Sequence, residues 1–347
     1  MRLSFPVSGK RHLLITGSRG AGKSTLLQGL LPEAALRITT WAEPGQGVYL
    51  RFGQQGEAVR IGTFDPSLPG PENRMSPEGE ALAKAAAQLD RLAMQPGEWA
   101  VIDEIGYLEC TCESYCRSLL SLLEHKRVLA AVRRQALPFL GQLLGREDAF
   151  AVDLDAPFGT SGCVIMASGL GQRFGSNKLL ADFHGQPLVC RALEATEGLF
   201  ARRVVVTRHR QVAALCGEQG VECVLHDLPD RSDTVRLGLE ALGHMERCLF
   251  CPGDQPLLRR DTVAALLLCA QHGPDAVWRP AFEGSPGAPV LFPAWAFPEL
   301  LALPTGMGGG YVVKKHPERV RLLPVRDAYE LMDADTPGAL RRLAEHR

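Results

Sequence analysis

Short apolar runs alternate with amphipathic stretches along the first half of the chain, and this alternation predicts strands separated by helices. The sequence predicts strands at residues 12–16, 99–104 and 128–133, and helices at residues 23–31, 79–93 and 118–126. Residues 43–60 alternate in polarity around central turn residues, which predicts a β-hairpin between the first two helices.

The same rhythm restarts after residue 162. Its expected order is strand 163–168, helix 188–196, strand 202–207, helix 211–219, strand 221–226, helix 233–242, strand 248–253 and helix 260–273. Strands separated by helices predict a parallel sheet with helices on both faces. We therefore expect an α/β protein of two three-layered αβα domains, residues 1–158 and 159–347, with the boundary near Pro157 to Gly162.

Composition narrows the class of protein. Of 347 residues, 46% are hydrophobic, which is enough for two separate cores, and 38 basic and 39 acidic residues give a net charge of −1. The basic residues are spread along the chain, which argues against nucleic acid or an anionic membrane as the main partner. No apolar run approaches the roughly 20 residues that span a bilayer, and the opening segment has too short an apolar stretch for a signal peptide. A cytoplasmic protein is expected.

Ten cysteines are present, but disulfide frameworks are typical of small secreted chains, so most of these cysteines are expected to be free thiols. Two groups are hypothetical metal sites. The first is Cys110, Cys112 and Cys116, and the second is Cys248 and Cys251. Neither group has an obvious second half of the four-ligand set that zinc requires.

Residues 17–24 (GSRGAGKS) follow a strand, open a helix and match the phosphate-binding P-loop pattern. In such a loop, backbone N–H groups surround phosphate oxygens, Lys23 reaches the β and γ phosphates, and Ser24 binds Mg²⁺. At the end of a later strand, Asp103 is expected to hold Mg²⁺ through water and Glu104 to orient or deprotonate the attacking water. The alternative is a pair of solvated strand-end carboxylates. The expected nucleotide-binding residues of this half are Gly17, Gly20, Gly22, Lys23, Ser24 and Thr25.

Over about residues 10–150 the chain resembles the P-loop nucleoside-triphosphatase family, through residues 17–26 (GSRGAGKSTL) and 103–109 (DEIGYLE). The resemblance implies slow hydrolysis of ATP, GTP or other nucleoside triphosphates with loose base preference. Residues 110–116 (CTCESYC) depart from the apolar residues usual at that place in the family.

A second glycine-rich turn lies in residues 163–180 (CVIMASGLGQRFGSNKLL). Its glycines alone are a weak dinucleotide signal, because Arg173 and Lys178 interrupt the loop. Two fixed cations suit a triphosphate better, since they neutralise its phosphates and stabilise the charge on departing pyrophosphate.

Over about residues 162–345 the chain resembles the MobA-like nucleotidyltransferases, in particular the molybdenum cofactor cytidylyltransferases. Five segments in the family's order carry the resemblance: 166–178 (MASGLGQRFGSNK), 185–189 (GQPLV), 251–258 (CPGDQPLL), 287–292 (GAPVLF) and 332–340 (MDADTPGAL). The resemblance implies a Rossmann-like, glycosyltransferase-A-like domain that transfers CMP from CTP to a molybdopterin-type cofactor with Mg²⁺. It also implies that Asp254 is a metal ligand and that residues 287–292 face the second substrate.

The implied reaction needs no protein nucleophile, because a phosphate oxygen of the acceptor attacks the α-phosphate in line. Mg²⁺ held by Asp254, with Asp333 or Asp335 as a second carboxylate, bridges the reacting phosphates. Asp335 or Thr336 is also well placed to cap a helix that starts at Pro337, so Asp333 is favoured for the metal.

Further nucleotide contacts are expected from two segments. They are Ala167, Ser168, Gly169 and Gly171 in the turn, and Ser232, Asp233 and Thr234 at a helix start. The last three either meet a pyrimidine edge or cap the helix. Ser168 stands where cofactor cytidylyltransferases typically have Ala and guanylyltransferases Gly, and CTP is favoured over GTP.

Together the two resemblances imply a bifunctional protein of molybdenum cofactor maturation. The hydrolysing half is expected to drive cofactor handling, insertion of the finished cofactor into a molybdenum hydroxylase apoenzyme, or a gated interaction with that enzyme. Two alternatives stay open. In the first alternative, the P-loop half is a nucleotide-dependent switch adaptor. In the second, the C-terminal half transfers a nucleotide to a sugar or alditol phosphate.

Overall fold

The computed structural model describes residues 1–68, 74–171 and 173–346. The chain divides into two compact units. The N-terminal unit is Gly9–Pro157, and the C-terminal unit combines Met1–Ser8 with the chain from Phe158 onward. None of the helices in these described residues is long and apolar enough to cross a membrane.

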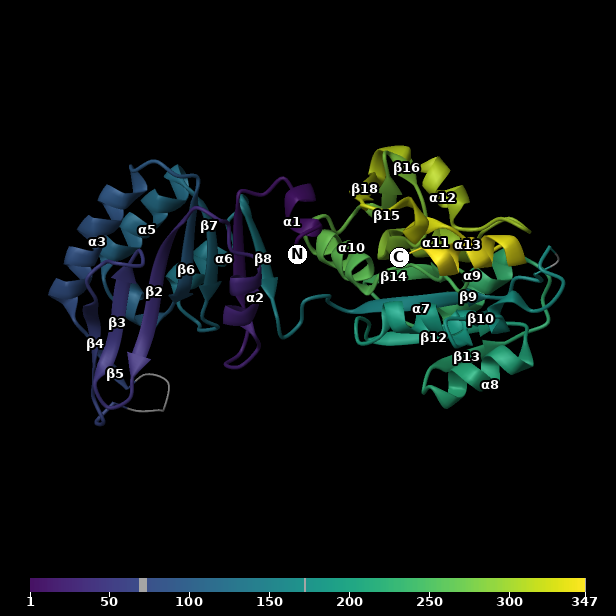
Figure 1. Cartoon of the computed structure of the whole chain (residues 1–347), viewed down its shortest axis with the longest axis horizontal. Helices are drawn as coiled ribbons and strands as arrows, with labels where there is room; N and C mark the ends of the chain where they lie inside the picture. The colour runs from purple at the N-terminus through teal and green to yellow at the C-terminus, as the bar shows by residue number, and fades with distance from the viewer. Residues whose placement is uncertain (69–73, 172, 347) are drawn as a thin grey trace. The chain divides into compact units, whose positions relative to one another are not determined.

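In the N-terminal unit, the described strands form one sheet of order β5-β4-β3-β2-β6-β7-β1-β8 (Figure 1). The strands are β1 (His12–Thr16), β2 (Ala35–Glu43), β3 (Gly47–Phe52), β4 (Val59–Phe64), β5 (Met75–Pro77), β6 (Trp99–Ile105), β7 (Arg127–Val132) and β8 (Ala149–Asp153). The helices are α2 (Lys23–Gly29), α3 (Gly79–Ala93), α4 (Tyr107–Cys110), α5 (Glu113–His125) and α6 (Pro138–Leu144). Apolar residues of α3, α5 and α6 share one buried cluster with the strands.

The C-terminal unit has a sheet of order β13-β12-β9-β14-β17-β15-β16, with β18 beside β15. The strands are β9 (Ser161–Ala167), β12 (Arg202–Thr207), β13 (Glu222–Leu225), β14 (Arg247–Pro252), β15 (Val277–Phe282), β16 (Ser285–Pro286), β17 (Val290–Pro293) and β18 (Val320–Pro324), with a separate hairpin of β10 (Asp182–Phe183) and β11 (Gln186–Pro187). The helices are α1 (Ser4–Val7), α7 (Leu188–Thr196), α8 (Arg210–Glu218), α9 (Arg231–Leu242), α10 (Arg260–His272), α11 (Phe297–Leu301), α12 (Gly310–Lys315) and α13 (Pro337–Glu345). Short 3-10 turns lie at Lys178–Leu180 (η1), Ala294–Ala296, Pro317–Arg319 and Ala328–Leu331.

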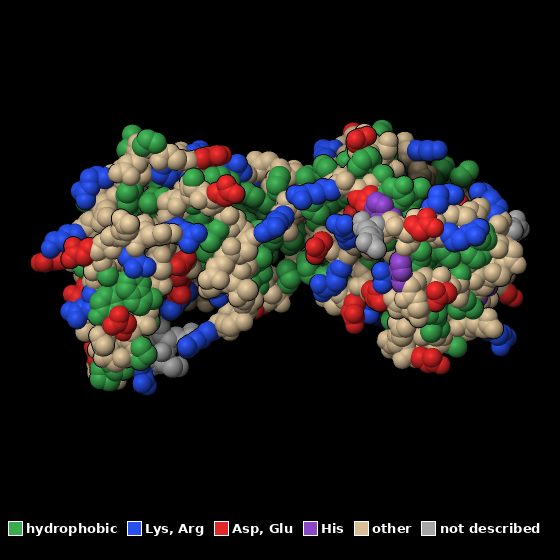
Figure 2. All heavy atoms as spheres, in the orientation of Figure 1, with side chains coloured by type: hydrophobic (Ala, Val, Ile, Leu, Met, Phe, Trp, Pro, Cys, Tyr) green, Lys and Arg blue, Asp and Glu red, His purple; other side chains and the backbone are tan. Residues whose placement is uncertain are grey.

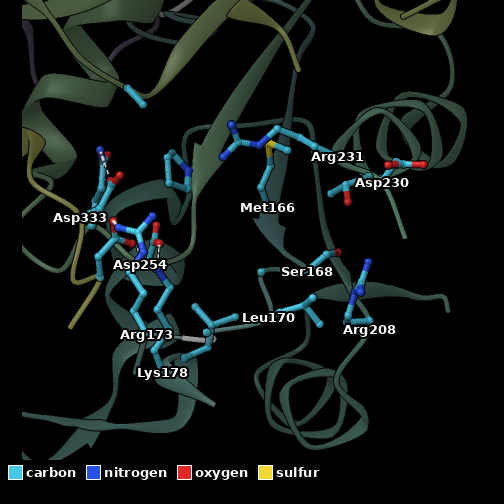
Figure 3. A pocket seen from close by; sticks show the side chains of 18 of the residues that line it. Met166, Ser168, Leu170, Arg173, Lys178, Arg208, Asp230, Arg231, Asp254 and Asp333 are labelled. Carbon is cyan, nitrogen blue, oxygen red and sulfur yellow. Dashed lines mark hydrogen bonds and ion pairs between the residues drawn. The ribbon is translucent and has the colours of Figure 1, made fainter. Parts of the chain in front are cut away.

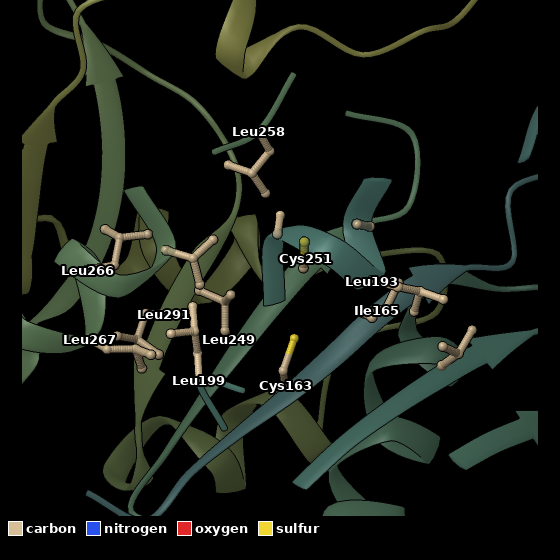
Figure 4. Packing of buried hydrophobic residues seen from close by; sticks show 14 of the residues in the cluster. Cys163, Ile165, Leu193, Leu199, Leu249, Cys251, Leu258, Leu266, Leu267 and Leu291 are labelled. Carbon is tan, nitrogen blue, oxygen red and sulfur yellow. The ribbon is translucent and has the colours of Figure 1, made fainter. Parts of the chain in front are cut away.

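Alternation along β9 explains the three layers of the C-terminal unit. Cys163 and Ile165 face a cluster that includes residues of α7, α8 and α10, whereas Val164 belongs to a cluster with residues of α9, α11 and α12. Figure 4 shows Cys163 and Cys251 among leucines in the first cluster. These two thiols serve as small apolar core residues, as expected.

The expected parallel sheet is wrong in part, because both sheets are mixed. In the C-terminal unit β17 runs antiparallel to both β14 and β15. The connection from β15 to β17 is too short for the crossover that a parallel pair requires, so the chain folds back. In the N-terminal unit the predicted hairpin is confirmed as β3 and β4, and it extends to β2 and β5 as further antiparallel pairs.

The first eight residues do not belong to the N-terminal unit, which corrects the expected domain of residues 1–158. Leu3 and Val7 pack against the apolar cluster of the C-terminal unit, and α1 contacts α10 and β18. The opening segment does contain apolar residues, but it is too short for a helical or strand periodicity to be recognised in the sequence. The N-terminal unit is therefore inserted between α1 and the rest of the C-terminal unit.

Charged side chains of both signs are mixed on the face of the molecule that Figure 2 shows. Figure 2 shows Lys and Arg interspersed with Asp and Glu over the visible face of both units. This distribution agrees with the near-zero net charge of the chain.

Replacing Leu3 and Val7 together by Asp is expected to destabilise the C-terminal unit by roughly 1–3 kcal/mol, because two apolar side chains leave its core. Hydrogen exchange followed by mass spectrometry should show faster exchange in peptides after residue 158 and unchanged exchange in residues 9–157. The matched control is Pro6→Ser, at an exposed position of the same helix. Equal exchange in the double variant and the control would show that α1 is dispensable for this unit.

Candidate functional site

A cavity of about 830 Å³ lies in the C-terminal unit where several strands end (Figure 3). Strands β12 and β14 both run parallel to β9, so the carboxyl ends of all three meet at one edge of the sheet. Ser168 follows β9, Arg208 follows β12 and Asp254 follows β14, and all three line the cavity. This edge is where open α/β sheets collect their ligands.

Lys178 is the centre of the charged side of the cavity. Its ammonium forms ion pairs with Asp254 and with Asp335, the latter at 2.9 Å between Nζ and Oδ1. The side chain is only 10% exposed. Burial alone lowers the pKa of Lys178, but the hydrogen bonds and charges of Asp254 and Asp335 outweigh it and raise the pKa above the ordinary value. The ammonium is therefore held charged at neutral pH.

Asp335 contacts both cations predicted in the glycine-rich turn. Arg173 Nη1 lies 3.7 Å from Asp335 Oδ2, whereas Lys178 contacts the other carboxylate oxygen, Oδ1. The hydrogen bond from Lys178 is the largest cause that lowers the pKa of Asp335. Thr336 is the N-terminal cap of α13, and its hydroxyl accepts a hydrogen bond from Ala339 N at 3.1 Å. Of the two residues that could have capped α13, Asp335 is thus the one that faces the cavity.

Asp333 lies beside Asp254 and is held by Gln255, the residue that follows Asp254 in the sequence. The Gln255 amide donates to Asp333 Oδ1 at 3.0 Å and to Leu331 O at 3.1 Å. The residue is exposed as a whole, yet surrounding atoms partly remove its carboxyl group from water. This burial, followed by the charge of Asp254, raises the pKa of Asp333. Two close carboxylates of this kind favour a cation between them.

The predicted metal residues do not make a protein-only metal cage. Among the described residues no group of three or more His, Cys, Asp and Glu side chains is arranged to hold an ion. Lys178 already occupies the space between Asp254 and Asp335. Asp254 and Asp333 nevertheless fit Mg²⁺, which is usually bound by one or two carboxylates together with substrate phosphates and water.

The glycine-rich turn brings backbone close to this cluster. Ser168, Gly169 and Gly171 line the cavity, whereas Ala167 is buried below it. Gly171 has a φ of 61°, and a Cβ there would lie 2.9 Å from Ser176 O. Only glycine fits this position, and its backbone is left open to a ligand.

The predicted base-reading residues separate in the structure. Thr234 lines the cavity, but Asp233 caps α9 by accepting from Asp230 N at 3.2 Å and pairs with Arg236. Ser232 is not among the residues that line the cavity. The capping alternative therefore describes Asp233, and Thr234 alone of the three faces the site.

Ser168 is tied into the protein at the opposite side of the cavity from Lys178. Its hydroxyl donates to Val206 O at 3.1 Å and lies 2.7 Å from His226 Nε2. Burial, followed by the charge of Arg208, lowers the pKa of His226. Ser168 thus fixes the wall of the cavity. In Figure 3 one side of the cavity groups Arg173, Lys178, Asp254 and Asp333, and the other groups Ser168, Arg208 and Asp230.

Sequence reasoning missed five polar residues that line the cavity: Arg208, Asp230, Arg231, Gln255 and Arg279. Arg208 follows a parallel strand directly and Gln255 follows Asp254, so the rule that strand ends meet at one edge could have found both. Arg279 lies inside β15, among residues whose sequence is typical of a buried strand, and no sequence motif includes it.

In the N-terminal unit, residues 17–22 form the loop between β1 and α2, and Lys23 and Ser24 are the first two residues of α2. Gly17, Gly20 and Gly22 have φ values of 146°, 83° and 89°, conformations that favour glycine. The Lys23 ammonium donates to the carbonyl oxygens of Gly17 and Ser18 at 2.7 and 2.8 Å, which folds the loop around it. Ser24 and Thr25, the remaining predicted contacts, are exposed at the start of α2.

Asp103 and Glu104 lie in the last part of β6, which is separated from the loop-bearing β1 by β7. Burial raises the pKa of Asp103 more than nearby Arg37 and a hydrogen bond with Thr39 lower it. Glu104 forms an ion pair with Arg133, which follows β7. Asp103 is thus partly buried, and Glu104 is paired with an arginine.

The cysteine groups do not support metal binding. All ten cysteines are free thiols in the structure. Burial raises the pKa of Cys110 to about 12 and also raises that of Cys116, so these thiols stay protonated near neutral pH. Burial likewise raises the pKa of Cys251 to about 12. In the part of the chain that the structure describes, no set of three or more His, Cys, Asp and Glu side chains is arranged to hold a metal ion at either group.

Comparison with known proteins identifies part of the chain. Residues 163–320 match the model of the MobA-like NTP transferase domain, so the C-terminal unit carries a domain of this family. A 3-deoxy-manno-octulosonate cytidylyltransferase of Neisseria meningitidis is 34% identical over 25% of this chain and 36% of its own length. A probable molybdenum cofactor guanylyltransferase of Aquifex aeolicus is 27% identical over 30% of this chain and 51% of its own length. The chain thus spans about half or less of the curated relatives it matches.

Solved structures to which the chain is similar include the Mycobacterium tuberculosis protein Rv0371c, with 21% identity and a TM-score of 0.49. The match covers 55% of this chain and all of that one. A nucleotidyl transferase from Methanothermobacter has 21% identity and a TM-score of 0.47 over 54% of this chain and 97% of its own.

Replacing Lys178 by Gln is expected to raise the pKa of Asp335 toward its ordinary value, because the hydrogen bond from Lys178 is the main cause of its depression. The pKa of Asp333 should rise as well, since Lys178 also lowers it. Carbon-13 NMR titration of the carboxyl groups measures both. Arg173→Gln is the matched control and should move Asp335 less, because Arg173 is a weaker cause. An unchanged Asp335 titration in Lys178→Gln would contradict the ion-pair geometry.

Proposed function

We propose that the C-terminal unit transfers the nucleotidyl group of a nucleoside triphosphate, preferentially CTP, to the terminal phosphate of a molybdopterin-type cofactor and releases pyrophosphate. The observation that carries the proposal is the cluster of Lys178, Asp254 and Asp335 in the cavity of an NTP transferase domain. A buried, permanently charged lysine beside a glycine turn suits a polyphosphate, and carboxylates beside it suit the accompanying cation.

Each group in the cluster has a role in this reaction. The backbone of the turn at Gly171 lies against the triphosphate, and Lys178 and Arg173 neutralise its outer phosphates. On transfer, the bond between the α and β phosphates breaks while the acceptor oxygen forms its bond to the α phosphate. Lys178 then stabilises the charge that collects on pyrophosphate. Asp254 and Asp333 hold Mg²⁺, which supplies charge neutralisation on the reacting phosphates. No side chain needs to form a covalent intermediate.

We propose CTP as the nucleotide and a molybdopterin-type cofactor as the acceptor. The five sequence segments shared with molybdenum cofactor cytidylyltransferases favour CTP and molybdopterin. The curated relatives include cytidylyltransferases and a probable guanylyltransferase, so GTP is the competing nucleotide. A sugar-type acceptor is the competing second substrate. In the proposal, Thr234 lies at the wall nearest the base and Ser168 holds the strand end beneath it.

Asp254→Asn is expected to lower transfer at least about a hundredfold, because the metal loses one of its two charged ligands during a step that builds charge. Release of pyrophosphate from CTP in the presence of molybdopterin and Mg²⁺ measures the rate, and Mn²⁺ should rescue it only in part. Asp275→Asn, an exposed aspartate outside the cavity, is the control. A rate near that of the unaltered protein in Asp254→Asn would remove this residue from the mechanism.

We also propose that the N-terminal unit binds and slowly hydrolyses a nucleoside triphosphate at residues 17–24. The supporting observation is the loop itself, with three glycines in left-handed or strained conformations around Lys23. Glu104, held by Arg133, orients the attacking water, and Asp103 with Ser24 holds Mg²⁺. Hydrolysis would then support insertion of the dinucleotide cofactor into a molybdenum hydroxylase apoenzyme.

Lys23→Ala is expected to abolish nucleotide hydrolysis and leave pyrophosphate release from the C-terminal unit unchanged. Glu104→Gln should keep nucleotide binding and slow hydrolysis by about 10²-fold or more, the scale of a general base. Phosphate release from ATP and GTP measures both, with Lys84→Ala on the exposed face of α3 as control. Binding without hydrolysis in the unaltered protein would instead identify the unit as a nucleotide-dependent switch.

A further inference from the structure

Arg279 is a cation that the proposed transfer does not yet use. It comes from β15, lines the same cavity as Lys178 and is half-buried. Its Nε donates to Gly287 O at 3.0 Å, which fixes the plane of the guanidinium group. Among the described residues no carboxylate lies within ion-pair distance of it.

Lys178 and Arg173 differ from Arg279 in this respect, because both contact the carboxylate of Asp335. Arg208, like Arg279, donates to a backbone carbonyl, Leu228 O, at 2.5 Å. Burial lowers the pKa of Arg279, and no charged group offsets that cost. An arginine stays protonated despite such a shift, so a charge is kept partly out of water without an anion beside it.

Strand order places Arg279 on the acceptor side of the reaction centre. The turn after β9 and Arg208 after β12 lie to one side of β14, and β15 lies to the other side beyond β17. Asp254, at the end of β14, stands between them. Because the glycine turn and Lys178 receive the triphosphate, the β15 side is left for the molecule that attacks it.

The wall of the cavity beside Arg279 is closely packed. Gly287 and Leu331 also line the cavity, and a Cβ at position 287 would lie 2.9 Å from Leu331 Cδ1. A larger residue at 287 would therefore displace this wall. With Nε engaged, the two terminal nitrogens of Arg279 remain to donate in parallel to two oxygens of one anionic group.

We infer that Arg279 binds an anionic oxygen group of the acceptor, a phosphate or a carboxylate, and thereby selects acidic acceptors and positions them for attack. The inference rests on the proposed transfer for the identity of the ligand as acceptor. The existence of an anion site at Arg279 stands on the structure alone. The residue positions the acceptor and takes no part in bond making.

The test follows the arginine Nε–H signals by NMR in the full chain, with Mg²⁺ and a CTP analogue bridged by methylene between the α and β phosphates. The analogue fills the triphosphate sites, so added inorganic phosphate or sodium acetate reports on other anion sites. The signal that disappears in Arg279→Gln is assigned to Arg279. It should shift saturably with phosphate, with acetate, or with both, and the responding anion identifies the acceptor group.

The kinetic expectation is an acceptor KM at least about tenfold higher in Arg279→Gln, with the KM for CTP unchanged. Arg321→Gln is the matched control, because Arg321 lies on the neighbouring strand β18 and is exposed outside the cavity. Arg279→Lys should restore part of the loss, since it keeps the charge but not the paired donors.

An Arg279 signal that moves with neither anion, or a change in the KM for CTP in place of the acceptor KM, overturns the inference. Failure of the unaltered protein to form any dinucleotide overturns the proposed function instead. In that case a saturable phosphate or acetate shift at Arg279 still establishes the anion site.

Discussion

The ion pairs of Lys178 with Asp254 and Asp335 join three distant segments of the C-terminal unit. Lys178 lies in the 3-10 turn after β9, Asp254 at the end of β14, and Asp335 just before α13. A partly buried ammonium is costly without paired carboxylates, so the three segments must meet for the lysine to stay charged. The same arrangement fixes one wall of the cavity and sets the charge that a triphosphate meets.

The constraint also explains why Asp333 differs from its neighbours. Asp254 and Asp335 each have Lys178 as a partner, whereas Asp333 has only the amide of Gln255. Its raised pKa is the result of burial beside Asp254. A divalent cation brought in with a nucleotide would relieve that repulsion. Asp333 is therefore a better partner for Asp254 in a metal site than Asp335 is. The sequence favoured Asp333 for a different reason, the capping of α13.

Much of this site could be predicted because it follows from repeating strand–helix units. Parallel strands place their carboxyl ends at one edge, so Lys178 and Asp254 could be expected to meet although 76 residues separate them. Which of Asp335 and Thr336 caps α13 could not be predicted, since adjacent residues compete for the same backbone N–H and only the surrounding charges decide. The antiparallel β17, the docking of α1 and the position of Arg279 all depend on contacts between distant segments, which no local pattern records.

The central claim is that the cavity around Lys178 moves a nucleotidyl group to an acidic acceptor. The most direct measurement incubates the full chain with molybdopterin-type cofactor, Mg²⁺ and each of CTP, GTP, ATP and UTP in turn, and identifies the products by mass. We expect a cytosine dinucleotide of the cofactor together with one pyrophosphate for each molecule formed. Absence of any dinucleotide with all four nucleotides, under conditions in which the protein is folded and binds CTP, would contradict it.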